Sequence, residues 1–262
     1  EELIRILFKT HSEYMVSFYD GIFNDLMTTA EDKHNDKTDI HFSICIIDNA
    51  IEFLPINMIN EDKYVKMVNI LMGYATNPSF TLKHGAMFGL GQVAAKGGIY
   101  FEKFRDEIIT IVLDGIKPVE TREFQKEYLA ARDNAIGALG RIINFQANNV
   151  NLNTLIPIWL EVLPVTVDEE EGIIQHQLLC DMISHLWTQV LGENFEYVPR
   201  VLKIFAEIYN ERVVNVETKK KIHELLTRFQ NDENAKKIVE EVFNQLDTEH
   251  QNALRQALDG KQ

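Results

Sequence analysis

The sequence predicts an all-α chain folded as a right-handed α-α superhelix, a HEAT-repeat solenoid. Amphipathic segments rich in small residues recur around Asp48, Leu90, Asp133 and Asp181, at steps of 42, 43 and 48 residues. That period is typical of HEAT and armadillo helix pairs. No segment alternates apolar and polar residues between hairpin turns, so we expect no strands. Because each repeat of a solenoid buries its apolar stripe on its neighbours, we expect a long binding surface rather than one core pocket.

Apolar periodicity and chain breakers predict the helices in order. Residues 1–10 are expected to be the second helix of a truncated pair, 12–29 starts the next pair, and the charged stretch 30–37 is expected to be a loop. The following expected helices are 38–54, 61–75, 81–96, 101–116, 121–145, 153–163, 169–190, 197–209, 216–229, 235–246 and 249–258. We therefore expect a single array over 1–262, with about six helix pairs and with 232–262 as C-terminal capping helices.

Composition is consistent with a protein of a reducing compartment. The two cysteines, Cys45 and Cys180, lie within apolar helical patterns, where they are expected to be small buried hydrophobic residues rather than a disulfide. No apolar run is long enough to span a bilayer, so we expect no membrane insertion. The chain begins Glu1-Glu2-Leu3 without an initiator methionine and already in helical rhythm, which predicts a fragment of a longer protein.

Net charge bears on the class of partner. The chain has 40 acidic and 26 basic residues and a formal charge of −14, which disfavours direct binding of nucleic acid through its phosphates. An acidic concave face would attract basic proteins. The same excess of charge could equally serve only to keep a solenoid with a large surface soluble.

Motifs for chemistry are lacking. Residues 89–94 (Gly-Leu-Gly-Gln-Val-Ala) resemble a dinucleotide fingerprint, but that motif needs a preceding strand, and these residues lie in a helical run. The eight histidines never take the His-Glu-x-x-His spacing, and the sequence contains no Cys/His quartet for zinc. It also lacks a nucleophile elbow and a phosphate-binding loop. We therefore expect no enzyme activity, no cofactor and no metal.

Polar residues at heptad spacing mark one face of several expected second helices. Residues seven apart project to nearly the same side of a helix, so such rows would line one surface of a stacked array. The candidates for a cargo-facing surface are Asp48, Glu52, Glu127, Asn134, Gln177 and Asp181. Every amphipathic helix has a polar face, however, and ordinary solvation explains the same pattern.

Two further features have a structural and a functional interpretation. The acidic run 168–171 either provides favourable charge at a helix N-terminus or anchors a basic segment. Trp159 and Trp187 are expected to pack between repeats, with a ligand platform as the alternative. Gly85, Gly89 and Gly91 are expected to let their helix approach its neighbour closely.

In its order of blocks, the chain resembles the C-terminal HEAT repeats of importin-β-type nuclear transport receptors, with the karyopherin β3 branch as the best match. The matching stretches are 44–52, 86–91 with Gly97-Gly98, 132–138, and 156–164 followed by the acidic run. Their order and spacing fit over residues 1 to about 230, and residues 246–258 are similar to the short helix that ends such receptors. The stretch 213–244 departs more from the pattern.

The resemblance implies a nuclear import receptor that shuttles between cytoplasm and nucleus. It implies cargo on the concave side formed by the second helices, with basic ribosomal proteins or histones as the cargo class, and nucleoporin phenylalanine-glycine repeats on the outward-facing first helices. Ran in its GTP form would release cargo, mainly through N-terminal repeats that this sequence lacks. A HEAT scaffold subunit of a phosphatase, coat or chromosome complex is the alternative, because the same fold serves both classes.

Overall fold

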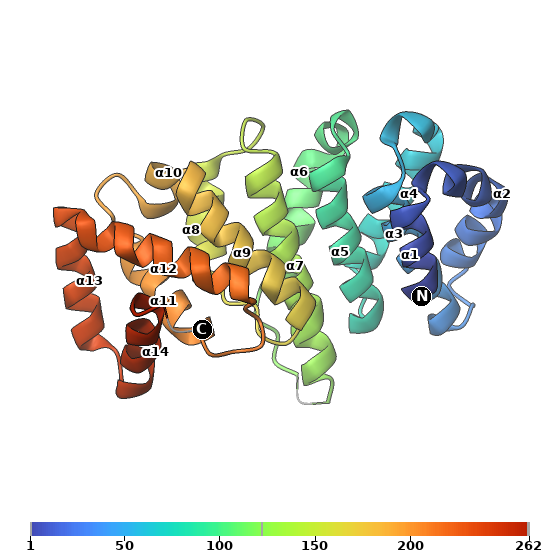
Figure 1. Ribbon diagram of the computed structural model, residues 1–262. Helices are drawn as coiled ribbons and strands as arrows, with labels where there is room; N and C mark the ends of the chain where they lie inside the picture. Colours follow the sequence, from blue (N-terminus) through green and yellow to red (C-terminus); the bar gives the residue numbers. More distant parts are fainter. Residues whose placement is uncertain (1, 122, 261–262) are drawn as a thin grey trace. The chain divides into compact units, whose positions relative to one another are not determined.

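Helices and short connections make up residues 2–121 and 123–260, the part of the chain that the computed structural model describes. No strand occurs in that part (Figure 1). The helices are α1 (Glu2–Thr10), α2 (Ser12–Glu31), α3 (Lys37–Phe53), α4 (Glu61–Ala75), α5 (Phe80–Lys96), α6 (Ile99–Gly115), α7 (Gln125–Phe145), α8 (Leu152–Val162), α9 (Glu169–His185), α10 (Trp187–Leu191), α11 (Val198–Ile208), α12 (Val216–Asn231), α13 (Glu233–Gln245) and α14 (Thr248–Leu258), with a 3₁₀ turn at Ile56–Met58. The all-α prediction is confirmed.

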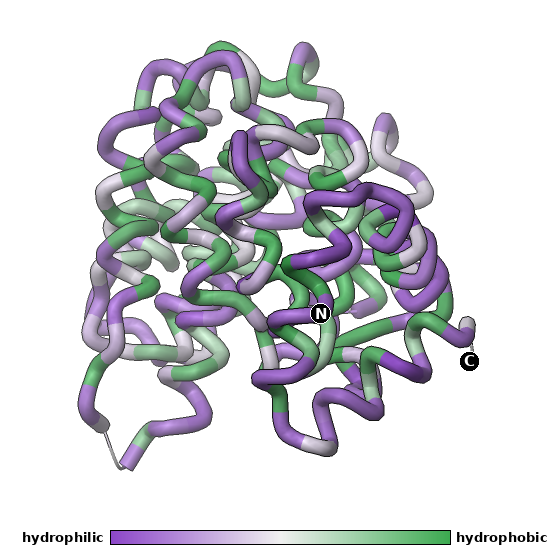
Figure 2. Tube along the Cα trace, turned by 90° about the vertical axis from the view of Figure 1, so that its left-hand side faces the viewer, coloured by the Kyte–Doolittle hydropathy of each residue, from purple (hydrophilic) through white to green (hydrophobic). Residues whose placement is uncertain are grey.

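Helix starts follow the sequence because short polar side chains cap them. The side chains of Asp36, Asn60, Asp168, Asn215 and Asp232 each accept a hydrogen bond from a backbone N–H in the first turn of α3, α4, α9, α12 and α13. Such caps satisfy donors that the helix itself leaves without partners. Along the helices hydrophobic and hydrophilic segments alternate, as amphipathic packing requires (Figure 2).

The chain divides into two compact units, Glu1–Asn149 and Val150–Gln262. In the first unit the helices form two layers (Figure 1). The second helices of the pairs make one layer, in which α5 packs between α3 and α7, and α1 packs on α3. The first helices make the other layer, in which α4 lies beside α2 and α6. Repeated helix pairs with like helices side by side are the arrangement that the repeat period predicts.

Close packing in the second-helix layer depends on small residues. At Gly91 an added Cβ would lie 3.1 Å from the Cα of Ala138, so α5 and α7 approach almost backbone to backbone. At Gly89 it would collide with the Asp48 carboxylate and lie 2.8 Å from Leu71 Cδ1. The predicted role of these two glycines in close helix approach is confirmed.

The second unit packs α9 on α12, and α11 on α13 and α14. Here one helix prediction is wrong: the expected helix 169–190 is broken at Leu186, whose backbone (φ −120°, ψ 44°) is not helical. The break brings the Trp187 ring to 5.4 Å from the ring of Phe229 and 6.3 Å from that of Phe195. The fully buried Phe229 and the half-buried Trp187 and Phe195 thus form an aromatic cluster at the break.

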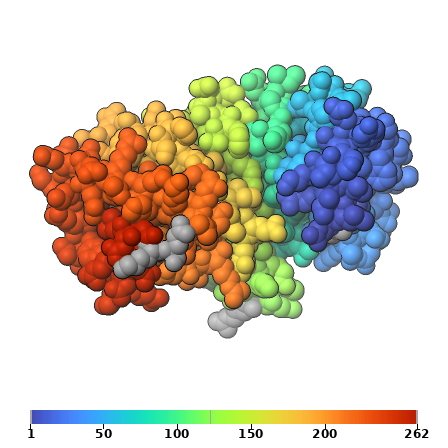
Figure 3. All heavy atoms as spheres, in the orientation of Figure 1, coloured from blue at the N-terminus to red at the C-terminus, as the bar shows by residue number. Residues whose placement is uncertain are grey.

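The N-terminal helices carry apolar side chains in solvent. Leu3 is 70% exposed and Tyr14 is 82% exposed, on α1 and α2. In the space-filling view α1, in dark blue, lies on the face turned toward the reader (Figure 3). Within the described residues no helix has the length and apolar character needed to cross a membrane.

Candidate binding surfaces

The six predicted cargo-facing residues do not share one environment. Asp48 and Asn134 are buried, with only 4% and 2% of their surface exposed. Glu52, Gln177 and Asp181 are half-buried, and Glu127 is exposed. The expectation that all six lie on a solvated surface is therefore wrong for Asp48 and Asn134. Both lie within the layer of second helices, where the neighbouring helices cover them.

Asp48 lies on α3 beneath the glycines of α5. Its Oδ1 atom is buried and has no hydrogen-bond partner. Burial raises the pKa of the Asp48 carboxyl well above its ordinary value of 3.8, and the charge of Glu52 raises it further. A buried carboxyl group with a raised pKa is less readily ionised and offers a partner less negative charge than an exposed carboxylate does.

Glu52 and Asp181 already have cationic neighbours within the chain. The Arg5 guanidinium lies 3.6 Å from Glu52 and also lies over the Phe53 ring. Lys221 Nζ donates to Asp181 Oδ1 at 2.7 Å, which links α12 to α9. Both carboxylates therefore attract a basic partner less than an isolated charge would.

Glu127 is the candidate whose position best suits binding. It lies in the first turn of α7 and borders a hollow of about 360 Å³ together with Lys37, Phe80 and the half-exposed Phe124. This hollow lies where α3, α5 and α7 begin. Of the six candidates, Glu127 alone combines an exposed carboxylate with a concave neighbourhood in the described part of the chain.

The acidic run 168–171 has a structural role. Asp168 caps α9 by accepting from the Glu171 N–H at 3.0 Å, and the buried Glu171 accepts from Gln175 Nε2 at 2.7 Å. Carboxylates in a first helical turn also interact favourably with the helix dipole. The structure thus favours the helix-terminus interpretation for Asp168 and Glu171. The side chains of Glu169 and Glu170 remain exposed.

The two tryptophans also pack against the protein. Trp159 is fully buried in α8. Trp187 packs against the rings of Phe195 and Phe229, and the Arg228 guanidinium lies 3.6 Å above its ring centre. The prediction that both residues serve packing is confirmed.

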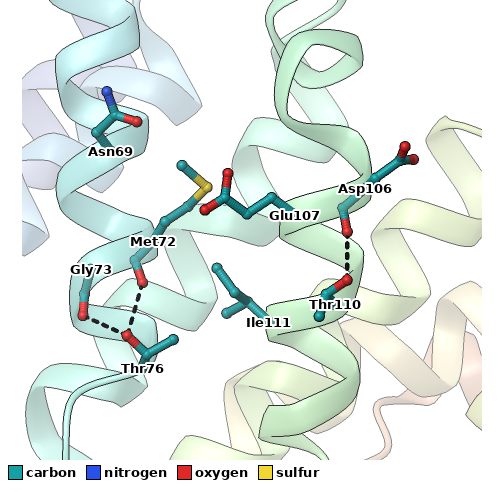
Figure 4. Close-up of a pocket in the computed structure, with 8 residues that line it drawn as sticks. All are labelled: Asn69, Met72, Gly73, Thr76, Asp106, Glu107, Thr110 and Ile111. Carbon is teal, nitrogen blue, oxygen red and sulfur yellow. Dashed lines mark hydrogen bonds between the residues drawn. The ribbon is translucent and has the colours of Figure 1, made fainter.

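A groove that sequence analysis missed lies between the first helices α4 and α6 (Figure 4). Its volume is about 730 Å³, within the range of ligand pockets. The lining residues are Asn69, Met72, Gly73, Thr76, Asp106, Glu107, Thr110 and Ile111. In Figure 4 the side chains of Met72, Glu107 and Ile111 point into the space between the helices, whereas Asp106 points away from α4.

The neighbouring seam between α2 and α4 is different. There Lys63 Nζ lies 2.6 Å from Asp20, and Lys66 Nζ lies 3.1 Å from Glu31. Between α4 and α6 a comparable ion pair lies at one end, where Lys103 Nζ is 3.6 Å from Glu61. The residues that line the groove itself are apolar, polar or acidic. None of them is a Lys or Arg that could bridge α4 to α6 and close the space between the helices.

Gly73 was the sequence signal that could have found this groove. It lies inside α4, is exposed, and an added Cβ there would meet no atom within 4 Å. A glycine inside a helix costs about 1 kcal/mol relative to alanine. Neither close packing nor an unusual backbone angle explains the residue.

No group of three or more His, Cys, Asp or Glu residues in the described ranges is placed to hold a metal ion. Neither Cys45, which is half-buried, nor Cys180, which is buried, forms a disulfide. Burial raises the pKa of the Cys180 thiol far above its ordinary value, which makes it a poor nucleophile.

Comparison with known proteins gives an informative relative. No family model matches the chain. The chain is 32% identical over 181 residues to a protein of Dictyostelium discoideum described as a probable importin-5 homolog. The aligned part covers 67% of this chain and 16% of that relative, so the chain corresponds to a small part of the relative's length.

Proposed function

We infer from this similarity that the chain belongs to the importin-β family and is the C-terminal part of a nuclear import receptor, of the karyopherin β3 branch. The observation that carries the proposal is the importin-like sequence of a chain built from paired helices. Fold alone would not support it, because HEAT-type arrays serve many functions. The receptor would bind basic cargo and nucleoporin repeats and shuttle between cytoplasm and nucleus. Ran would act on it mainly through other repeats.

Electrostatics support basic cargo as the ligand class. The net charge of −14 attracts cations over long range, with a strength that salt reduces. Glu127 on α7 and Glu170 on α9 are exposed carboxylates on second helices. Asp48 is buried and its pKa is raised well above 3.8, so it adds little to this attraction. Proposed cargo such as ribosomal proteins or histones would be recognised by its density of Lys and Arg.

The proposal is tested by pull-down of the chain with three immobilised baits. These are phenylalanine-glycine repeats, a Lys-rich tail from a ribosomal protein or histone, and a phosphatase catalytic subunit. We expect the first two to retain the chain, and repeats with Phe changed to Ser to lose it. Retention by the phosphatase subunit alone would favour the alternative, a scaffold subunit of a multiprotein complex.

Charge reversal at chosen positions separates attraction of cargo by particular carboxylates from the effect of net charge alone. The double variant Glu127→Lys with Glu170→Lys is expected to weaken binding of a basic cargo peptide several-fold and to flatten its salt dependence. The matched control is Glu13→Lys with Glu240→Lys, which makes the same charge change on the first helices α2 and α13. Equal loss in both variants would mean that only net charge matters. Undiminished binding in the first would remove these two carboxylates from cargo recognition.

A further inference from the structure

The groove between α4 and α6 has features that ordinary helix packing does not need. Met72 and Ile111 form the apolar floor of the groove. Gly73 leaves the α4 side of the groove without a side chain at that position. The two helices are already held together elsewhere, since Tyr64 near the start of α4 stacks on Tyr100 of α6 with ring centres 4.5 Å apart. The two helices thus meet near their starts, and the hollow lies farther along them.

One carboxylate at this groove has no cation of its own. Glu107 is exposed and points across the groove toward Met72 in Figure 4. Among the described residues no Lys, Arg or His lies within salt-bridge distance of it, whereas the adjacent Asp106 pairs with Arg105 Nε at 2.9 Å. The groove thus presents a single available negative charge beside an apolar floor.

A polar group for a peptide backbone is also present. The Asn69 amide is exposed on α4 at the groove, and within the described ranges it makes no side-chain hydrogen bond. A primary amide can donate to a carbonyl and accept from an N–H, which are the two groups that an extended peptide offers. Thr76 and Thr110 are less suitable as donors, because their hydroxyls donate to carbonyl oxygens of their own helices, at 3.0 Å to Gly73 and 2.7 Å to Asp106.

We propose that this groove binds an extended peptide segment in which a large apolar side chain is followed by a Lys or Arg. The apolar side chain lies on Met72 and Ile111 in the space that Gly73 leaves open. The cationic side chain pairs with Glu107, and the Asn69 amide contacts the peptide backbone. Charge complementarity at Glu107 selects this class of segment over an uncharged apolar one. The proposal goes beyond the function inferred above and does not rest on it.

The test uses the whole chain with ¹³C-labelled Met and Ile methyl groups and NMR titration. The probe is a Gly/Ser peptide with one Phe-Lys pair, compared with versions in which Phe becomes Ala or Lys becomes Gln. We expect shifts at the Met72 and Ile111 methyl groups. We also expect at least about tenfold weaker binding without Phe, which corresponds to about 1.4 kcal/mol. Without Lys we expect about threefold to tenfold weaker binding, which corresponds to about 0.6–1.4 kcal/mol.

Protein variants locate the site. Gly73→Leu is expected to abolish binding while the chain stays folded, because the added side chain meets open space. Gly21→Leu is the matched control, since Gly21 is another exposed glycine inside a first helix, α2, with no atom within 4 Å of an added Cβ. Glu107→Gln should weaken binding of the Phe-Lys peptide but not of the Phe-Gln peptide, with Glu13→Gln as its control.

Several outcomes would overturn the proposal. Equal binding of the Phe-Lys and Phe-Gln peptides would make the groove a general apolar site, including one for phenylalanine-glycine repeats. Undiminished binding to Gly73→Leu would place the peptide elsewhere on the chain. Absence of methyl shifts at millimolar peptide would remove the groove as a peptide site, whatever the pull-downs show for the chain as a nuclear transport receptor.

Discussion

At the scale of single residues, Gly89 and Asp48 form one contact between α5 and α3. The side chain of Asp48 occupies the place where any other residue at 89 would put its Cβ. The small residue thus permits a polar one beneath it, and the pair sets how closely the two helices approach. Each member can be changed separately, and the expected effects differ.

Replacement of Gly89 by Leu is expected to lower the free energy of unfolding by about 1–3 kcal/mol, because the new side chain has to displace Asp48 and Leu71. Thermal unfolding followed by circular dichroism measures the change. Gly73→Leu is the control, since it adds the same side chain to a neighbouring helix in open space. Equal melting temperatures for the two variants would contradict the packing at Gly89.

Asp48 makes stability depend on pH in a definite direction. Its pKa is raised in the folded chain, so the folded state keeps a proton that the unfolded state loses as pH rises above about 4. Asp48 therefore costs more stability the further the pH lies above 4. Asp48→Asn cannot ionise, and we expect it to raise the melting temperature more at pH 7 than at pH 4.

The measurement is thermal unfolding of the wild type and of Asp48→Asn at pH 4, 5, 6 and 7. For a chain of this size each kcal/mol corresponds to about 2–4 °C in melting temperature. Asp25→Asn, an exposed carboxylate on α2, is the control and should show little change at any pH. A shift for Asp48→Asn that is the same at all four pH values would mean that burial does not perturb its titration.

At the scale of elements, helix α4 makes different contacts with its two neighbouring first helices, α2 and α6. Two lysines of α4 bridge to carboxylates of α2, which closes that seam. On its other side α4 presents Asn69, Met72 and Gly73 to α6, and that seam stays open. One helix thus provides a sealed contact on one side and a groove on the other, although both sides have helical periodicity.

The break between α9 and α10 is a second case at this scale. Local periodicity favours one continuous helix, but the Trp187 ring has packing partners on α12 and in the 192–197 connection. A tertiary contact that involves Phe229, more than 40 residues away, decides the end of the helix. Helix propensity is a weak determinant compared with burial of aromatic rings.

At the scale of the whole molecule, the repeat period predicts an elongated right-handed superhelix over 1–262. A compact domain of this length would have a radius of gyration of about 18 Å. We expect small-angle X-ray scattering of the chain to give a clearly larger value, with a long tail in its distance distribution. A value near 18 Å would contradict a single extended array.

The sequence by itself determined that the chain is helical, where nearly every helix begins and ends, and which glycines permit close packing. These properties follow from contacts between near neighbours in sequence and from side-chain size, which a repeat of about 42–48 residues makes visible. The tertiary structure alone decided which polar residues are accessible. Asp48 and Glu127 look alike in a heptad pattern, but α5 covers the first and solvent surrounds the second. It also decided where a groove opens, since the space beside Gly73 belongs to two helices and is visible in neither alone.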